Sequence, residues 1–199
     1  MKISNRPILA VLIGILIGGI VFGIYVYLAK AQQTVTVTAT VPTSVTCTLS
    51  TSTTAFGTID PSNVYTSNPN ITVTVSCNPS GGCQVQVKDQ GNGTNPGLYN
   101  STANYLIQSQ DATLVAGTEG YGIQAATTTA GSGSTLSLNS KYNKTGNDVG
   151  GLTTSYTILA TSSSPTANRE IVVTHKAAVS GLTPAGTYQD TITYNCTSN

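Results

Sequence analysis

Four cysteines are the residues of this chain whose chemistry is easiest to predict. Cys47, Cys77, Cys83 and Cys196 make an even number in a chain of 199 residues, and all follow an N-terminal apolar segment. Beyond a membrane, in an oxidising environment, such cysteines pair as disulfides. Zinc is the competing use, but the Cys77/Cys83 gap is too wide for a zinc knuckle and no histidine lies near. We expect two disulfides and no metal site.

The pairing of these cysteines stays open at this point. Four cysteines allow three pairings, and strand alternation places every one of them on an inward face, so alternation does not choose. Cys77 with Cys83 would close a hairpin and leave Cys47 with Cys196 to link the first strand to the last. Cys47 with Cys77, leaving Cys83 with Cys196, is an equal alternative.

Catalytic chemistry finds little support in the sequence. The single histidine, His175, lies in the alternating run of residues 171–176 and is expected to be a structural strand residue. A catalytic histidine needs a nucleophile and an orienting carboxylate, and no Gly-x-Ser-x-Gly turn supplies the nucleophile. None of the seven carboxylates lies in a pattern typical of acid–base catalysis. We therefore expect a protein that is not an enzyme and uses no cofactor.

Two local patterns suggest ligands or modification only weakly. Asp89-Gln90-Gly91-Asn92-Gly93 has oxygens that suit calcium, but the EF-hand spacing and its closing glutamate are missing, which favours a plain turn. Asn-x-Ser/Thr sequons are as frequent here as an Asn- and Thr-rich composition produces by chance, so they only leave glycosylation open. The sequons lie at Asn70, Asn92, Asn100, Asn143 and Asn195.

The N-terminus has the composition of an export signal. Lys2 and Arg6 precede an uncharged run over residues 7–28, and Ala29-Lys30-Ala31 matches the pattern before a signal-peptidase cut. The apolar run, about 22 residues long, is also long enough to span a bilayer, so an uncleaved signal anchor is the alternative. In either case the positive end stays in the cytoplasm and the chain after Ala31 is translocated.

The composition of residues 32–199 excludes some partners. This part has five cations and seven carboxylates, a net charge of −2. Nucleic acid is not expected as a partner, because phosphate binding needs clustered Lys and Arg. Val, Ile, Leu and Tyr recur at regular spacing among abundant Thr, a pattern that indicates a folded β protein rather than disorder.

Period-two alternation predicts a series of short strands. The first covers residues 33–49, broken near Pro42, and others cover residues 71–77, 121–126, 170–176 and 188–196, with one more beginning at Cys83. Residues 125–140 are almost purely Ala, Thr, Gly and Ser and are expected to form a long surface loop. The predicted fold is an all-β sandwich over residues 32–199, preceded by one transmembrane or signal helix over residues 1–31.

Several motifs together resemble a known family. Cys47, Phe56-Gly57, Val73-Thr74-Val75-Ser76-Cys77 and the terminal Pro184-Ala185-Gly186-Thr187-Tyr188-Gln189-Asp190-Thr191-Ile192 follow in the order typical of spore coat protein U domains and archaic chaperone-usher pilins. The resemblance covers about residues 41–196 and is most specific at the terminal Gly-x-Tyr-x-Asp-Thr. It implies an immunoglobulin-like, incomplete β-sandwich located at the cell surface or secreted. The length of the apolar run, and not the resemblance, makes residues 7–28 a membrane anchor if they are uncleaved.

The same resemblance implies a role for the N-terminal segment. In that family an N-terminal extension inserts as a donor strand into a neighbouring subunit, and here the candidate donor residues are Val35, Val37, Ala39 and Val41. The alternative is that this strand completes its own sandwich. A retained membrane anchor would hold the segment beside its own domain, which favours self-completion.

Two functions follow from these expectations. The first is a structural cell-surface or pilus-like subunit that associates with copies of itself or with other surface proteins, with strand exchange as one route of assembly. The second is a membrane-anchored, adhesin-like binding module that uses tyrosines on loops as contacts. The candidate contact residues are Tyr99, Tyr105, Tyr121, Tyr142 and Tyr156.

Overall fold

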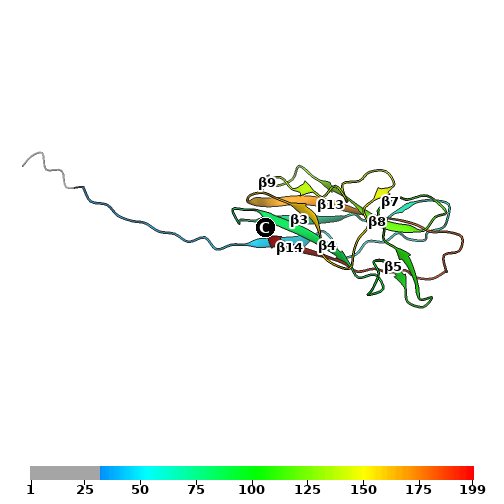
Figure 1. Cartoon of the computed structure of the whole chain (residues 1–199). Coiled ribbons are helices and arrows are strands. Elements are labelled where there is room, and N and C mark those ends of the chain that lie inside the picture. The colour runs from blue at the N-terminus through cyan, green and yellow to red at the C-terminus, as the bar shows by residue number, and fades with distance from the viewer. Residues whose placement is uncertain (1–31) are drawn as a thin grey trace, which may run out of the picture. The chain divides into compact units, whose positions relative to one another are not determined.

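The computed structural model describes residues 32–199 (Figure 1). The signal peptide or anchor predicted over residues 1–31 lies outside this range. In the described residues, no helix is long and apolar enough to cross a membrane. The chain divides into two units, residues 1–41 and residues 42–199, and the strands of the described part lie in the second.

The unit formed by residues 42–199 is all-β, and every strand pairing in it is antiparallel. Its strands are β1 (Val45–Leu49), β2 (Tyr65–Thr66), β3 (Ile71–Cys77), β4 (Cys83–Asp89), β5 (Gly97–Asn100), β6 (Tyr105–Gln108), β7 (Ala112–Thr113), β8 (Gly120–Thr127), β9 (Ser132–Gly133), β10 (Ser137–Leu138), β11 (Asp148–Val149), β12 (Thr157–Thr161), β13 (Thr166–Ala178) and β14 (Ile192–Ser198).

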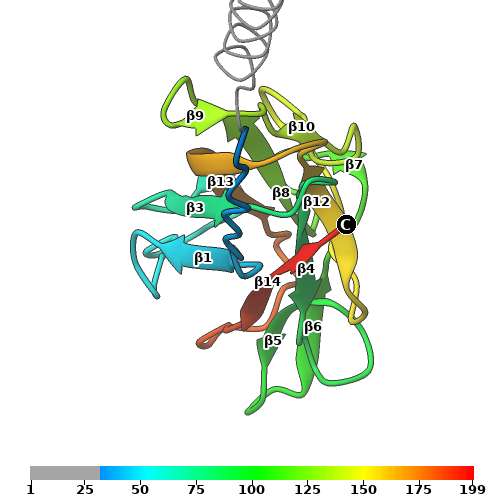
Figure 2. The same cartoon turned by 90° about the vertical axis from the view of Figure 1, so that its left-hand side faces the viewer.

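Two larger sheets organise this unit. One has the strand order β1-β3-β13-β2, with β8 and β9 also paired to β13, and the other has the order β10-β12-β4-β14. Two small hairpin-like sheets, β5–β6 and β7–β11, complete the arrangement. As a result, β1 ends one large sheet and β14 ends the other, and the two edges lie side by side (Figure 2).

Strict alternation of residue types builds the core between the large sheets. In β3 and β4 every second residue is buried, and the inward valines Val73, Val75, Val85 and Val87 belong to a single apolar cluster. Each valine fully removed from water stabilises the fold by roughly 1.5–3 kcal/mol. The outward positions carry Thr, Ser, Gln and Lys, as the period of two requires. The strand predicted over residues 71–77 is confirmed as β3.

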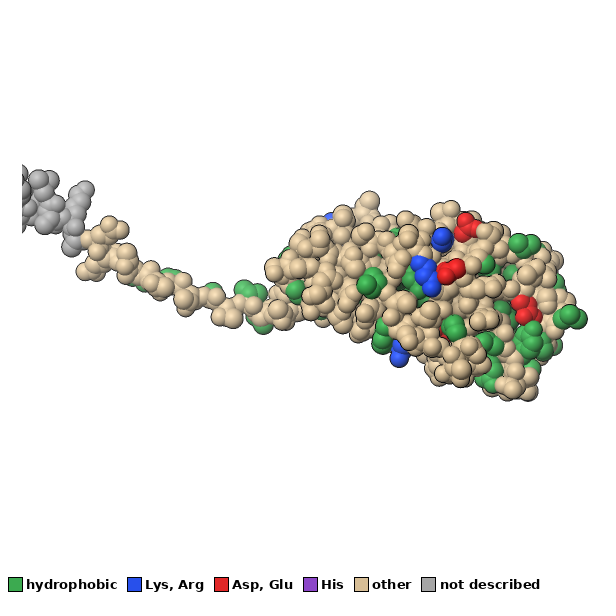
Figure 3. All heavy atoms as spheres, in the orientation of Figure 1, with side chains coloured by type: hydrophobic (Ala, Val, Ile, Leu, Met, Phe, Trp, Pro, Cys, Tyr) green, Lys and Arg blue, Asp and Glu red, His purple; other side chains and the backbone are tan. Residues whose placement is uncertain are grey.

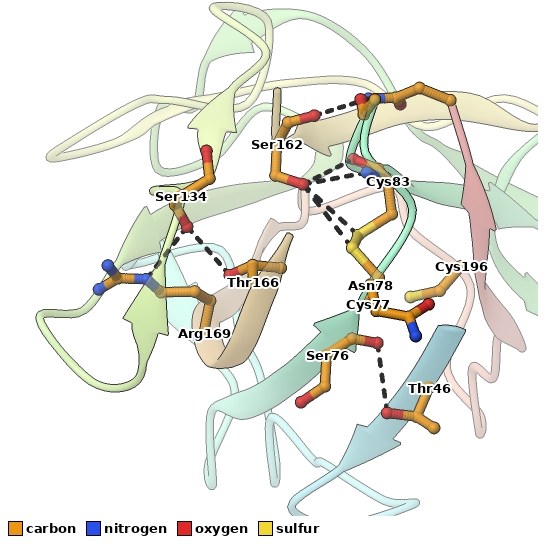
Figure 4. The surroundings of a disulfide bond; sticks show 12 residues. Thr46, Ser76, Cys77, Asn78, Cys83, Ser134, Ser162, Thr166, Arg169 and Cys196 are labelled. Carbon is orange, nitrogen blue, oxygen red and sulfur yellow. Dashed lines mark hydrogen bonds between the residues drawn. A yellow bond between two sulfur atoms is a disulfide. The ribbon is translucent and has the colours of Figure 1, made fainter. Parts of the chain in front are cut away.

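Two disulfides cross-link the core, and they follow the first of the two pairings considered above. Cys77–Cys83 closes the connection from β3 to β4, and Cys47–Cys196 joins β1 to β14. Figure 4 shows the buried Ser162 hydroxyl beside the first bridge, where it accepts the Cys83 N–H at 3.0 Å and lies within 3.8 Å of both sulfurs. Two disulfides are typical of a protein that folds in an oxidising, extracytoplasmic environment.

The N-terminal strand predicted over residues 33–49 is shorter in the structure. Only Val45–Leu49 forms a strand, and residues 33–44 form none, with every side chain of residues 32–44 exposed. The alternation of Val and Thr gives this segment the capacity to pair, but a strand also needs a neighbour that satisfies its N–H and C=O groups. β1 has that neighbour in β3, with Val45 opposite Cys77 and Leu49 opposite Val73.

Other strand boundaries depart from the prediction for local reasons. The strand expected from Tyr188 begins at Ile192, because residues 184–191 form the wall of a groove. The loop expected over residues 125–140 contains the short strands β9 and β10. Arg169 fixes this loop by donating from its guanidinium to the carbonyls of Ala130 and Gly133 and to that of Ser134, the last of which Figure 4 shows.

The two disulfides are expected to contribute unequally to stability. Cys47–Cys196 spans 149 residues and Cys77–Cys83 spans 6. Loop-closure entropy assigns the long bridge about 5 kcal/mol and the short one about 2 kcal/mol. We expect Cys47→Ala/Cys196→Ala to lower the free energy of unfolding in urea well below that of Cys77→Ala/Cys83→Ala. Equal losses in the two double variants would contradict this ranking.

Candidate functional site

The strongest candidate site lies where the edges of the two large sheets meet. β1 pairs only with β3 and β14 only with β4, so within residues 32–199 each has one edge without a strand partner. At the Cys47–Cys196 bridge their Cα atoms are 5.9 Å apart. A strand between them would need about 4.8 Å on each side. The disulfide therefore closes the gap at this level, and the gap opens beyond Leu49.

A groove of about 1030 Å³ occupies the open part of this gap. Residues 51–61 form one wall and residues 183–192 the other, while the floor is made of residues from both sheets and from β5. The floor residues are Ile71, Leu98, Tyr121, His175, Val179 and Tyr194. The volume lies at the upper end of the range of about 300–1,000 Å³ usual for small-molecule sites. Its two walls are chain segments rather than strands of a sheet.

Both walls are paired on one side only. Ala55 exchanges backbone hydrogen bonds with Asn68, and Gln189 exchanges them with Tyr99. Within the described residues, the alternate positions Tyr188 and Asp190 make no backbone–backbone hydrogen bond. Because backbone groups of an extended chain point to alternate sides, this leaves donors and acceptors free on the groove side.

The terminal Gly-x-Tyr-x-Asp-Thr motif builds the second wall. Gly186 has φ of 145°, and a Cβ on it would lie 2.4 Å from the Asn100 side-chain nitrogen, so only glycine fits. Tyr188 donates its hydroxyl to the carbonyl of Pro184 at 2.8 Å, which fixes the turn. Asp190 accepts the N–H groups of Gly91 and Thr191 at 3.0 and 2.7 Å.

A second carboxyl group lies directly against Asp190. Asp89, at the end of β4, is 1% exposed and accepts the Gly97 N–H at 3.2 Å through Oδ1. The Oδ2 atoms of both aspartates are buried without an N–H or hydroxyl partner, and the two carboxyl groups are close enough to share a hydrogen bond. Since a hydrogen bond between two carboxyl groups needs a proton, the pair holds one.

Burial and the neighbouring charge explain why this proton is retained. Burial first, and then the charge of Asp190, raises the pKa of Asp89 from 3.8 to about 8. Burial also raises the pKa of Asp190. At neutral pH the pair therefore carries one negative charge, and that charge is held by backbone N–H groups.

A buried aromatic pair continues the polar cluster across the floor. The Tyr121 hydroxyl lies 2.9 Å from Nδ1 of His175, and the two rings stack with centroids 6.1 Å apart. Burial lowers the pKa of His175 to about 4 and raises that of Tyr121, so both are neutral. Phe56 of the first wall packs edge-on against Tyr121. His175 is thus a buried strand residue whose ring contacts the Tyr121 hydroxyl.

The outer end of the second wall is fixed by one carboxylate. Glu119 accepts the hydroxyl of Tyr105 at 2.9 Å, the hydroxyl of Ser180 at 3.3 Å and the hydroxyl of Thr183. These bonds join β6 and the residues before β8 to the segment that follows β13. The groove is therefore bounded by a wall that is anchored at both ends.

The residues predicted for assembly and those predicted for ligand contact differ in their exposure to solvent. The donor candidates lie in a segment without strands, and Val35, Val37 and Val41 are among its highly exposed apolar side chains, at 87%, 87% and 79%. Ala39 is exposed as well. Of the five tyrosines expected on loops, Tyr99, Tyr105 and Tyr121 lie in β5, β6 and β8, so the expected loop position is wrong for these three. Tyr121 and Tyr142 are buried.

The turn at Asp89 uses its own oxygens. Asn92 accepts the N–H groups of Thr94 and Asn95 through its side-chain oxygen, and Asp89 points into the protein rather than into the turn. Residues 32–199 contain no group of three His, Cys, Asp or Glu side chains that could hold a metal ion.

The sequence analysis missed the carboxyl pair, although alternation contains a signal for it. Every second residue from Cys83 to Val87 points inward, so Asp89, two residues after Val87, is inward as well. Asp190 lies two residues before the inward Ile192 and has the same parity. β4 and β14 then place Asp89 opposite Ile192. An acidic residue at an inward position of a strand is the pattern that could have revealed this site.

Comparisons with protein families, with curated proteins and with solved structures find no match to this chain.

The carboxyl pair makes the stability of the domain depend on pH. Because the folded protein holds this proton more tightly than the unfolded chain, stability falls as pH rises from about 4 to about 8. The lowered pKa of His175 acts in the opposite direction below pH 6.5. We therefore expect the clear effect between pH 6.5 and pH 8, a loss of about 2 kcal/mol in the free energy of unfolding.

Asp89→Asn tests the origin of this loss. The amide can keep the acceptor for Gly97 and donate to Asp190 without a titrating proton. Urea unfolding of the variant should be nearly independent of pH between 6.5 and 8. A variant that keeps the wild-type slope would show that another group causes it.

Proposed function

We propose that this protein is a structural cell-surface subunit that assembles when the N-terminal segment of one copy adds as a strand to the groove of the next. In this proposal residues 42–199 form an immunoglobulin-like sandwich that lacks one strand, and residues 33–41 supply it. Export follows from the N-terminal signal, whether residues 1–31 are removed or retained as an anchor.

The observation that carries this proposal is a match between a donor and an acceptor in one chain. The acceptor is a groove whose walls are paired on one side only, and the donor is an exposed segment in which Val and Ala alternate with Thr. Strand addition joins main-chain groups along the edge and places every second side chain in the groove. Val35, Val37, Ala39 and Val41 share one side of an extended strand and would fill it.

Chain geometry favours donation between copies over self-completion. Only residues 42–44 separate the donor segment from β1. If the segment folded back on its own β1, residues 37–41 would lie beside Val45–Leu49, where the disulfide closes the gap. Only the remaining residues 33–36, about 13 Å of strand, would then extend into the groove. A segment from a second copy can enter with its full length of about 30 Å.

Two further features support this assignment. Tyr188 donates to a carbonyl four residues upstream, a bond of the kind that fixes corners in immunoglobulin-like sandwiches. The groove wall is also built from the Gly186, Tyr188 and Asp190 positions of the motif that resembles the spore coat protein U and archaic pilin family. The adhesin-like alternative has less support, because two of its five proposed contact tyrosines are buried.

A charge on the donor should abolish assembly. In Val35→Asp/Val37→Asp the donor would carry carboxylates into the apolar groove, at a cost of several kcal/mol. The full-length wild-type protein, extracted from the surface, should give a ladder in unboiled detergent gels that collapses on boiling. The double variant should run as a monomer in both conditions.

The matched control is Val115→Asp. Val115 is 58% exposed and lies outside the groove, so this variant should keep the ladder. The donor variant also keeps its own groove, so mixing it with wild-type protein should end growing assemblies and shorten the ladder. Wild-type protein that is monomeric under every condition would overturn the proposal.

A further inference from the structure

We propose that strand addition in this groove is coupled to a proton on the Asp89–Asp190 carboxyl pair. An occupied groove keeps the proton between the two Oδ2 atoms, and an empty groove can release it to the solvent in alkaline conditions. Assembly is then favoured at neutral and acidic pH and reversed by alkali. This inference rests on the proposed function, since it concerns the same groove.

The position of the pair connects it to the groove. Asp190 lines the groove and is partly exposed, whereas Asp89 lies behind it and is 1% exposed. Oδ1 of Asp89 accepts the Gly97 N–H and Oδ1 of Asp190 accepts those of Gly91 and Thr191, whereas both Oδ2 atoms are buried. Besides the opposite carboxyl group, the Tyr121 hydroxyl is the side-chain donor that faces Asp190. A strand in the groove would therefore cover Asp190 and remove its remaining contact with water.

The described surroundings place no cation beside the pair, and the Tyr121 hydroxyl and backbone N–H groups are the donors that face it. The titratable groups that face the pair are Tyr121 of β8 and Tyr194 of β14, with His175 of β13 behind Tyr121. All three are neutral at physiological pH, since burial raises the pKa of both tyrosines and lowers that of the histidine. Lys88 extends to the other face of β4, 4.8 Å from the ring of Tyr156.

Covering the pair must therefore shift its proton equilibrium. Loss of water raises the free energy of the doubly ionised state more than that of the state with one proton. By linkage, a strand binds more tightly to the protonated groove, and binding takes up a proton wherever the empty groove has lost one. The largest effect of one proton is a tenfold change in affinity per pH unit.

The test uses a donor and an acceptor that are both defined. The acceptor is the full-length Val35→Asp/Val37→Asp protein, and the probe is a capped peptide with the natural sequence of residues 32–43, which contains no titratable side chain. Calorimetry between pH 6.5 and pH 9.5 should give a constant affinity below about pH 7 and a fall approaching tenfold per pH unit above pH 8. Titration in two buffers of different ionisation enthalpy should detect proton uptake.

Two variants separate the carboxyl pair from other causes. Asp89→Asn, added to the acceptor, should bind the peptide with the same affinity across the range and without proton uptake. Asp148→Asn replaces an exposed aspartate on β11 and should leave the pH dependence unchanged. If Asp89→Asn does not fold, Asp190→Asn replaces it, since the amide oxygen can still accept the N–H groups of Gly91 and Thr191.

The outcomes distinguish the inference from the proposed function. Peptide binding with no pH dependence and no proton uptake would overturn the proton coupling and leave strand addition intact. Failure of the peptide to bind at any pH would overturn strand addition itself. A pH dependence that survives Asp89→Asn would assign the proton to another group and also overturn the inference.

Discussion

The Cys47–Cys196 disulfide is the constraint on which the rest of the site depends. β1 and β14 belong to different sheets and share no backbone ladder, so the bridge holds their edges together at one level. The same bond keeps a third strand from entering there. Past the disulfide, the residues that follow β1 form one wall of the groove, and residues 183–191, which precede β14, form the other. One covalent link thus sets both the closed and the open part of the edge.

Alternation in the sequence predicts the core strands well because the inward positions of each strand are apolar and the outward positions are polar. β3 has Val or Ile on every inward position and Thr or Ser on every outward one, and its bounds follow directly. The pattern was just as regular over residues 33–44, where no strand forms. Periodicity states which face of a segment would be buried, whereas strand formation also requires a neighbour with free N–H and C=O groups. In this chain the free edges of β1 and β14 are held together by the Cys47–Cys196 disulfide, which leaves no room for a further strand at that level.

The parts of the site that sequence reasoning missed depend on contacts between distant segments. Asp89 and Asp190 are 101 positions apart, and only the β4–β14 register brings them together. The strand β12 was missed because Thr, Ser and Ala dominate its surroundings and leave no clear period. The groove leaves no pattern of its own in the sequence, since it is formed where two segments fail to pair. The one sequence motif that coincides with a groove wall is the terminal Gly-x-Tyr-x-Asp-Thr, which contains Gly186, Tyr188 and Asp190.

The polar floor of the groove also bears on the proposed addition of a strand from another copy. A domain selected only for stability would place apolar side chains where Tyr121, His175 and the Tyr194 hydroxyl are buried, because buried polar groups add desolvation cost without a larger core. Here they lie where the sheet is incomplete, next to the apolar residues Phe56, Leu98 and Ile192. Buried polar networks fix one arrangement among several apolar ones. We infer that the polar floor defines the depth and register of an entering strand, and that the apolar residues supply the affinity.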